Sequence, residues 1–137
     1  MNKILEAYNK TNEFGRFFNM TYEVVSPGHV VFNMEVTKDM LATPKAMHGG
    51  ALAAMMDAVV GVAAVSVSSL KGNIVSTVEF KINYLKPVFL GEVLKGEGTV
   101  ISEGNRIIVC KGEIYNEQKE LVAIATSTMN AYPFSKM

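Results

Sequence analysis

The sequence has few of the residues that build disulfides and metal sites. It contains one cysteine, Cys110, so an internal disulfide is impossible, and a lone thiol suits a reducing compartment. Its two histidines, His29 and His48, lie in different contexts without clustered cysteines or carboxylates. Zinc and iron sites require such ligands at characteristic spacings. We therefore expect no disulfide framework and no metal.

The sequence also lacks an excess of charge. It has 13 basic and 13 acidic residues, a formal net charge of zero, and no stripe of Lys or Arg anywhere along the chain. A partner with a phosphate backbone requires a basic footprint. We therefore expect no nucleic-acid partner.

Residues 1–18 contain no apolar stretch typical of a secretion signal, because Lys3, Glu6, Lys10 and Glu13 interrupt them. We expect a cytoplasmic protein. One apolar run does occur, at residues 51–70, and it has the length of a membrane span. Asp57 in its middle, the serines near its end and the strand-like sequence after it favour a buried central helix and no membrane contact.

Asp57 is the single charge in that run. Burying an unpaired carboxylate among Ala, Val and Met side chains costs free energy. Asp57 must therefore have either a structural partner or a chemical task.

The chain of 137 residues fits one domain, 1–137. The pattern predicts a helical arm at residues 1–19 and a central helix at about 49–70 that stops at Gly72. Alternation and turn residues predict strands at residues 21–26, 29–36, 76–85, 92–101, 106–115 and 121–129. The last four strands are expected to form a meander of successive hairpins. This predicts an α+β fold in which an antiparallel sheet wraps one helix.

Small residues suit such close packing. The central helix is rich in Ala and Gly, which lets a curved sheet approach it. Gly96 and Gly98 in a predicted strand indicate either bends or close backbone approach.

Several motifs follow one another along the chain: His48-Gly49-Gly50, Asp57 in the next helical turns, and a strand at residues 77–87 that ends in Tyr84-x-x-Pro87 before Gly91. Together they resemble the hotdog fold, and within it the PaaI-like acyl-CoA thioesterases related to the 4-hydroxybenzoyl-CoA thioesterase superfamily. The resemblance covers nearly the whole chain after residue 20. It implies thioester hydrolysis, no cofactor beyond the coenzyme A of the substrate, and a homodimer or homotetramer with sites between subunits.

Thioester hydrolysis needs hydrogen-bond donors for the oxyanion and a base or nucleophile. A helix start offers free backbone N–H groups, and Gly50, with Gly49 beside it, is the candidate donor. Asp57 would activate water or attack directly. Gly50 and Asp57 stand roughly 10 Å apart along one helix. One site using both must therefore combine two subunits around a two-fold axis.

Thr77 and His48 complete the candidate catalytic set. By the resemblance, Thr77 holds the attacking water, although an ordinary β-branched strand residue is an equal alternative. Alternation places Thr77 on the polar face with Glu79 and Lys81. His48 has two possible roles. It is either a general acid or base, or a residue that orients the start of the helix, and we prefer the second role.

The resemblance further implies that acyl-CoA runs along Tyr84 and the turn at residues 102–106, where Arg106 meets a phosphate. The alternative for this turn is a solvated hairpin tip. The candidate substrate-binding residues are Gly49, Glu79, Tyr84, Ser102, Gly104, Asn105 and Arg106. The methionines Met40, Met47, Met55 and Met56 line an acyl pocket or fill the core, and Cys110 is expected in the core.

The sequence departs from the family pattern at one position. Many PaaI-like enzymes carry Asn where this chain has Ala42, and its amide helps to bind the thioester carbonyl. Thr43 is a possible substitute. A non-catalytic acyl-CoA-binding protein is thus the alternative to a thioesterase. The hotdog dehydratases are disfavoured because their hydration motif is absent from the sequence.

Overall fold

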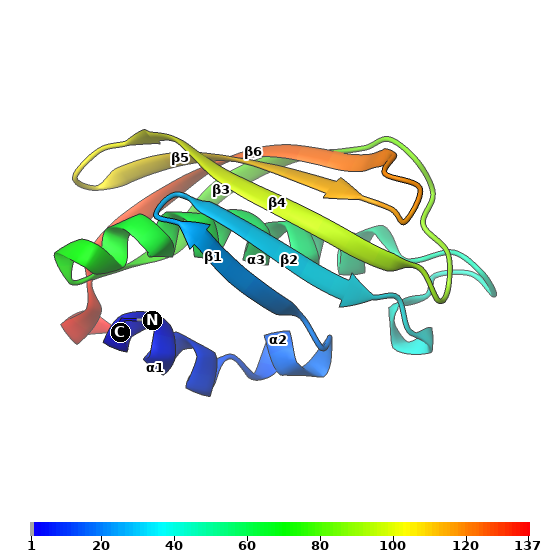
Figure 1. Ribbon diagram of the computed structural model, residues 1–137, viewed down its shortest axis with the longest axis horizontal. Helices are drawn as coiled ribbons and strands as arrows, with labels where there is room; N and C mark the ends of the chain where they lie inside the picture. The colour runs from blue at the N-terminus through cyan, green and yellow to red at the C-terminus, as the bar shows by residue number, and fades with distance from the viewer. Residues whose placement is uncertain (1) are drawn as a thin grey trace.

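Six antiparallel strands form one curved sheet in the computed structural model, which describes residues 2–137 (Figure 1). The sheet order is β1-β2-β4-β5-β6-β3. The strands are β1 Thr21–Ser26, β2 His29–Glu35, β3 Asn73–Tyr84, β4 Val93–Glu103, β5 Ile107–Tyr115 and β6 Leu121–Pro133. The predicted strands are therefore all present, with β6 extending beyond its predicted end.

The long helix α3, Gly49–Ser68, lies against the concave face of the sheet. Its Met55, Met56, Val59 and Val60 are fully buried there. The helix is long and apolar enough to cross a membrane, but most of it is covered by the rest of the chain. Its composition thus reflects its place in the core, and the prediction of a sheet wrapped around one helix is confirmed.

Helix α3 ends where the sequence predicts, shortly before Gly72. After Ser68 the chain makes one 3₁₀ turn, η2 Ser69–Lys71, and then stops at Gly72. Gly72 adopts the left-handed conformation, with φ of 77°, which a residue without a side chain adopts at low cost.

The prediction of a four-stranded meander is wrong for β3. Strands β4, β5 and β6 are successive neighbours, but β3 pairs with β6 and forms an edge of the sheet. The connection at residues 85–92 is not a hairpin. Its Leu90 N–H donates to the Lys45 carbonyl and its Gly91 N–H to the Val36 carbonyl, so it leads the chain to the side of β2. Alternation indicates which face of a strand is buried, but not which strand lies beside it.

The predicted arm consists of two helices, α1 Lys3–Thr11 and α2 Glu13–Phe17, which pack on the side of α3 away from β5 and β6 (Figure 1). Met1 lies outside the described residues. Asn12 separates the helices, and its side chain accepts a hydrogen bond from Gly15 N–H at 3.0 Å and so caps α2. Leu5 and Phe18 are buried in the core, which attaches both ends of the arm.

Glycines in β4 and β5 allow α3 to approach the sheet. A Cβ on Gly98 would lie 2.6 Å from the Val59 carbonyl oxygen of α3, and one on Gly112 would lie 2.5 Å from Met56 Sδ. The interpretation of Gly98 as a site of close backbone approach is confirmed.

We predict that Gly98→Ala destabilises the protein by about 1–3 kcal/mol, because the new methyl group meets backbone that cannot move aside. Gly61→Ala is the matched control, since a Cβ on Gly61 would meet nothing within 4 Å and Gly61 lies inside a helix. The control should be neutral or stabilise by up to about 1 kcal/mol. Urea denaturation measures both changes. A Gly98→Ala variant as stable as the parent protein would show that α3 and β4 are not closely packed.

Candidate active site

The first turn of α3 is organised by His48. This residue is the N-cap, and its Nδ1 accepts a hydrogen bond from Gly50 N–H at 2.7 Å. Nδ1 is the acceptor in this geometry, so the His48 ring caps the helix start. Among the described residues, no group accepts a hydrogen bond from Gly49 N–H. The helix start therefore has one available donor, and a second one if the ring of His48 turns away.

Tyr84 lies beside the same helix start. Its hydroxyl donates to the Gly49 carbonyl at 2.9 Å, and a hollow of about 330 Å³ extends from Gly49 and Tyr84 to Leu52, Pro87 and Val88. The structure thus brings together the predicted residues His48, Gly49, Gly50 and Tyr84.

Asp57 lies in the middle of α3 and is partly buried. The hydroxyl of Thr77, on β3, donates to Asp57 Oδ1 at 2.8 Å. The structural partner expected for this carboxylate is therefore Thr77. Since one oxygen accepts this bond, Oδ2 is the carboxylate oxygen to which no described residue donates.

The side-chain orientation of Thr77 depends on a β-bulge. The register of β3 with β6 shifts between Thr77 and Glu79, so that Val78 has no direct partner in the ladder. Thr77 faces α3 with Phe80, while Glu79 lies on the outer face and accepts from Thr128 at 2.6 Å. The prediction that Thr77 shares a face with Glu79 is wrong, because strict alternation cannot anticipate the extra residue of a bulge.

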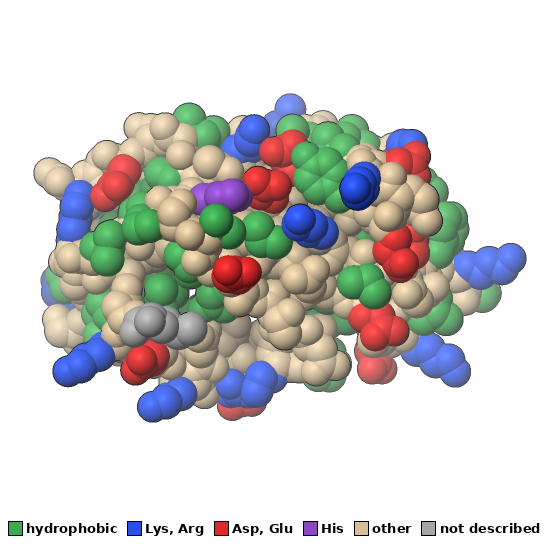
Figure 2. Space-filling model, viewed as in Figure 1, with side chains coloured by type: hydrophobic (Ala, Val, Ile, Leu, Met, Phe, Trp, Pro, Cys, Tyr) green, Lys and Arg blue, Asp and Glu red, His purple; other side chains and the backbone are tan. Residues whose placement is uncertain are grey.

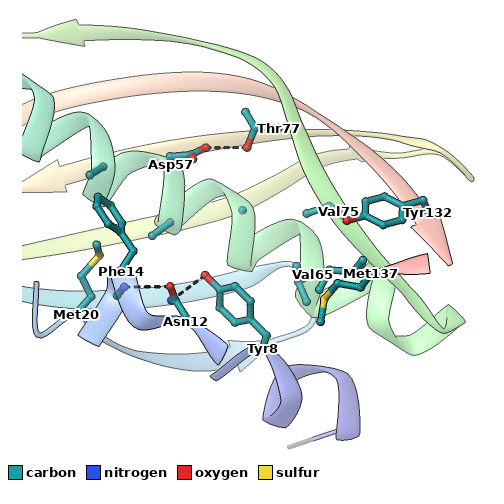
Figure 3. A pocket seen from close by; sticks show the side chains of 15 residues that line it. Tyr8, Asn12, Phe14, Met20, Asp57, Val65, Val75, Thr77, Tyr132 and Met137 are labelled. Atoms are coloured by element: carbon teal, nitrogen blue, oxygen red, sulfur yellow. Dashed lines mark hydrogen bonds between the residues drawn. The ribbon is translucent and has the colours of Figure 1, made fainter. Parts of the chain in front are cut away.

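A cavity of about 360 Å³ adjoins Asp57 and Thr77 (Figure 3). Small residues of α3, namely Ala54, Ala58 and Gly61, form one wall. The helical arm forms another wall, which includes Tyr8 and Asn12. Sequence reasoning missed the arm residues, since their helical spacing indicated packing but not the element they pack against.

Gly50 and Asp57 lie on one continuous helix, as predicted. Their separation of two turns, roughly 10 Å, leaves the helix start and the Asp57–Thr77 pair as two half-sites in each chain. A single small reacting group cannot contact both half-sites of one chain.

The predicted turn at residues 102–106 lies far from the helix start. Lys71 Nζ, just beyond the end of α3, is 2.9 Å from Glu103 Oε2 in this turn. Ser102, Gly104, Asn105 and Arg106 therefore lie at the opposite end of α3 from Tyr84, and the two groups do not meet within one chain.

Most of the sulfur-containing candidates lie in the core. Met40, Met55 and Met56 are buried, whereas Met47 lines the hollow beside Gly49. Burial raises the pKa of the Cys110 thiol to about 12, so it is a poor nucleophile at neutral pH. Cys110 is a core residue, as expected.

The departure at Ala42 lies in an exposed turn next to the helix start. Ala42 N–H donates to the Ala46 carbonyl, and Thr43 Oγ1 accepts from Ala46 N–H at 2.9 Å. Thr43 thus closes its own turn, and within the described residues its side chain has no hydrogen bond to Gly49 or Gly50.

The remaining charged groups are dispersed. Figure 2 shows acidic and basic side chains interspersed over the face it presents. His29 Nε2 lies 2.8 Å from Glu97 Oε1, away from the half-sites. Within residues 2–137, no three His, Cys, Asp or Glu side chains are grouped as metal ligands.

The sequence is similar to that of known thioesterases. The thioesterase superfamily matches residues 45–123, which include both half-sites. The medium/long-chain acyl-CoA thioesterase YigI of Escherichia coli K12 is 26% identical over 94 residues, covering 60% of each chain. The chain spans between 60% and 80% of the length of the curated relatives that it matches.

Solved structures agree as well. The PaaI protein of the E. coli phenylacetic acid degradation operon superposes with a TM-score of 0.87 at 24% identity, covering 95% of this chain and 91% of that one. A hypothetical thioesterase of Streptococcus pneumoniae, solved with coenzyme A, gives 0.82 at 28% identity, covering 94% and 97%. This chain therefore belongs to the thioesterase superfamily, and it shares the hotdog fold of the PaaI protein.

Proposed function

We propose that this protein is an acyl-CoA thioesterase, which hydrolyses an acyl-CoA to the free acid and coenzyme A in a site shared by two subunits. The observation that carries the proposal is the Asp57 carboxylate held by Thr77 on the wall of a cavity. The superfamily, the activity named for the E. coli relative and the coenzyme A bound to the streptococcal neighbour support it.

Asp57 acts as the general base or as the nucleophile of the reaction. Thr77 fixes the carboxylate through Oδ1 and leaves Oδ2 toward the substrate. In one route Oδ2 removes a proton from water, the hydroxide adds to the acyl carbon, and the C–S bond then breaks. In the other route Oδ2 itself adds to the acyl carbon, and water hydrolyses the resulting anhydride. In both routes the CoA thiolate leaves and takes up a proton.

The start of α3 supplies the hydrogen-bond donors for the thioester carbonyl. Gly49 N–H points from the positive end of a helix of 20 residues, and Gly50 N–H joins it when His48 releases its bond. These donors stabilise the oxyanion that forms on the thioester carbonyl. Ala42 has no side-chain amide to add a further donor.

A two-fold axis beside β3 would combine the half-sites. Strand β3 is a sheet edge of 12 residues, and its central Val78 is 60% exposed. Long, exposed, apolar edges are normally covered in soluble proteins. Antiparallel pairing of two β3 strands covers this edge and places two α3 helices side by side. Asp57 of one subunit then faces the helix start of the other.

The same axis offers a path for coenzyme A. Tyr84 and the turn at residues 102–106 lie at opposite ends of α3, so two antiparallel subunits bring the turn of one toward Tyr84 of the other. Arg106 of that turn would then meet a phosphate of the nucleotide. A cytoplasmic homodimer, or a tetramer built from two such dimers, fits this arrangement.

The test is release of free thiol from a panel of acyl-CoAs. We predict that Asp57→Asn lowers kcat by about 100- to 10,000-fold, because the amide is neither a base nor a nucleophile. Thr77→Val, which keeps the shape but removes the hydroxyl, should lower kcat by about 10- to 100-fold through misorientation of Asp57. Thr77→Ser keeps the donor and is the matched control.

Equal rates for the parent protein and Asp57→Asn would remove Asp57 from the mechanism. If the folded parent protein binds acyl-CoA tightly but releases no thiol, the chain is instead a non-catalytic acyl-CoA-binding protein. The missing amide at Ala42 is the feature that favours this second outcome.

A further inference from the structure

The cavity beside Asp57 is lined by separate segments of the chain. The helical arm contributes Tyr8, Asn12 and Phe14, and α3 contributes the stripe of small residues that ends at Gly61. Further lining residues come from β3, the end of β6 and the C-terminal Met137. The catalytic candidate Asp57 thus opens onto a space whose far wall belongs to the N-terminal arm.

The polar side chains of this cavity form two hydrogen-bonded pairs, and the Tyr132 hydroxyl lies apart from both beside Val75. One is the Asp57–Thr77 pair, and the other is the pair formed by Tyr8 and Asn12, whose amide donates to the Tyr8 hydroxyl at 3.1 Å (Figure 3). Aliphatic, aromatic and thioether groups line most of the rest. A bound group would therefore be apolar along its length, with its reactive end beside Asp57.

The arm is held in position before any ligand binds. Asn2 Nδ2 donates to Ser69 Oγ at 2.8 Å, beyond the end of α3, and Tyr22 Oη donates to Asn9 at 2.6 Å. Leu5 anchors α1 in the core. Because these contacts fix the arm, the far wall is preformed, and a ligand does not bear the entropic cost of ordering it.

The arm wall also remains uncharged. Burial, with smaller contributions from Tyr22 and Asp57, raises the pKa of Tyr8 to about 12. Tyr8 is therefore neutral at physiological pH, and its aromatic ring contributes apolar surface to the cavity.

We infer that this cavity receives the acyl chain, and that the N-terminal arm and Gly61 limit the acyl group to a medium length. The inference rests on the proposed thioesterase activity. The volume of about 360 Å³ lies near the lower end of the range of small-molecule sites, so a long chain would exceed it. A very short chain would leave most of the apolar wall in contact with water.

Gly61 offers a direct way to test this role. It lines the cavity, and a Cβ at this position would meet no atom within 4 Å. A larger side chain at this position therefore occupies cavity space without displacing the core. Since Gly61 lies inside α3, a non-β-branched replacement also favours the helix.

The experiment compares kcat/KM for butanoyl-, octanoyl- and palmitoyl-CoA in the parent protein, Gly61→Leu and Gly61→Ala. We expect the parent protein to prefer octanoyl-CoA. Gly61→Leu should lose about 10-fold or more on octanoyl-CoA, because several methylene positions are blocked, and change little on butanoyl-CoA. Gly61→Ala adds a single methyl group with a similar helix preference, so its loss on octanoyl-CoA should be smaller than that of Gly61→Leu.

Two results would overturn the inference while the thioesterase proposal stands. The first is an unchanged chain-length profile in a folded, active Gly61→Leu variant. The second is a Gly61→Leu variant with an altered oligomeric state by light scattering, which would place Gly61 in a subunit interface. A parent protein that hydrolyses none of the three substrates would instead contradict the thioesterase proposal itself.

Discussion

The close packing of α3 into the concave sheet is the constraint on which the site depends. Glycines of β4 and β5, such as Gly98 and Gly112, bring the sheet against one side of the helix. The opposite side is left to small residues, to the helical arm and to Asp57. A carboxylate can sit in the middle of an apolar helix because this side is only partly covered and because Thr77 donates to it. The packing and the chemistry thus use opposite faces of one helix.

The β-bulge at Val78 is the second requirement. Without the extra residue, alternation would turn Thr77 to the outer face of the sheet and leave Asp57 without its hydroxyl partner. The bulge also distinguishes Thr77 from Glu79, which faces away from α3. Bulges commonly redirect a side chain next to an active site, and the one in β3 does so beside a strand edge that another subunit could extend.

Local signals predicted most of the elements and part of the site. The apolar run, Gly72 and the alternating strands depend on neighbours in sequence, and these were confirmed. The position of β3 beside β6, the bulge and the contact of the arm with the Asp57 cavity depend on partners far along the chain. Periodicity carries no information about such partners. The distance between Gly50 and Asp57 was predictable because helix geometry alone sets it.

Complementation between two inactive variants tests most directly whether two subunits share each site. Asp57→Asn removes the carboxylate, and Gly49→Pro removes the available N–H donor at the first helical position, where proline is tolerated. When the two folded variants are unfolded and refolded together at equal concentration, a site shared across the two-fold axis predicts recovery of about a quarter of the parental rate. Half of the dimers are then mixed, and each contains one intact site. Activity no greater than that of the separate variants would contradict a shared site.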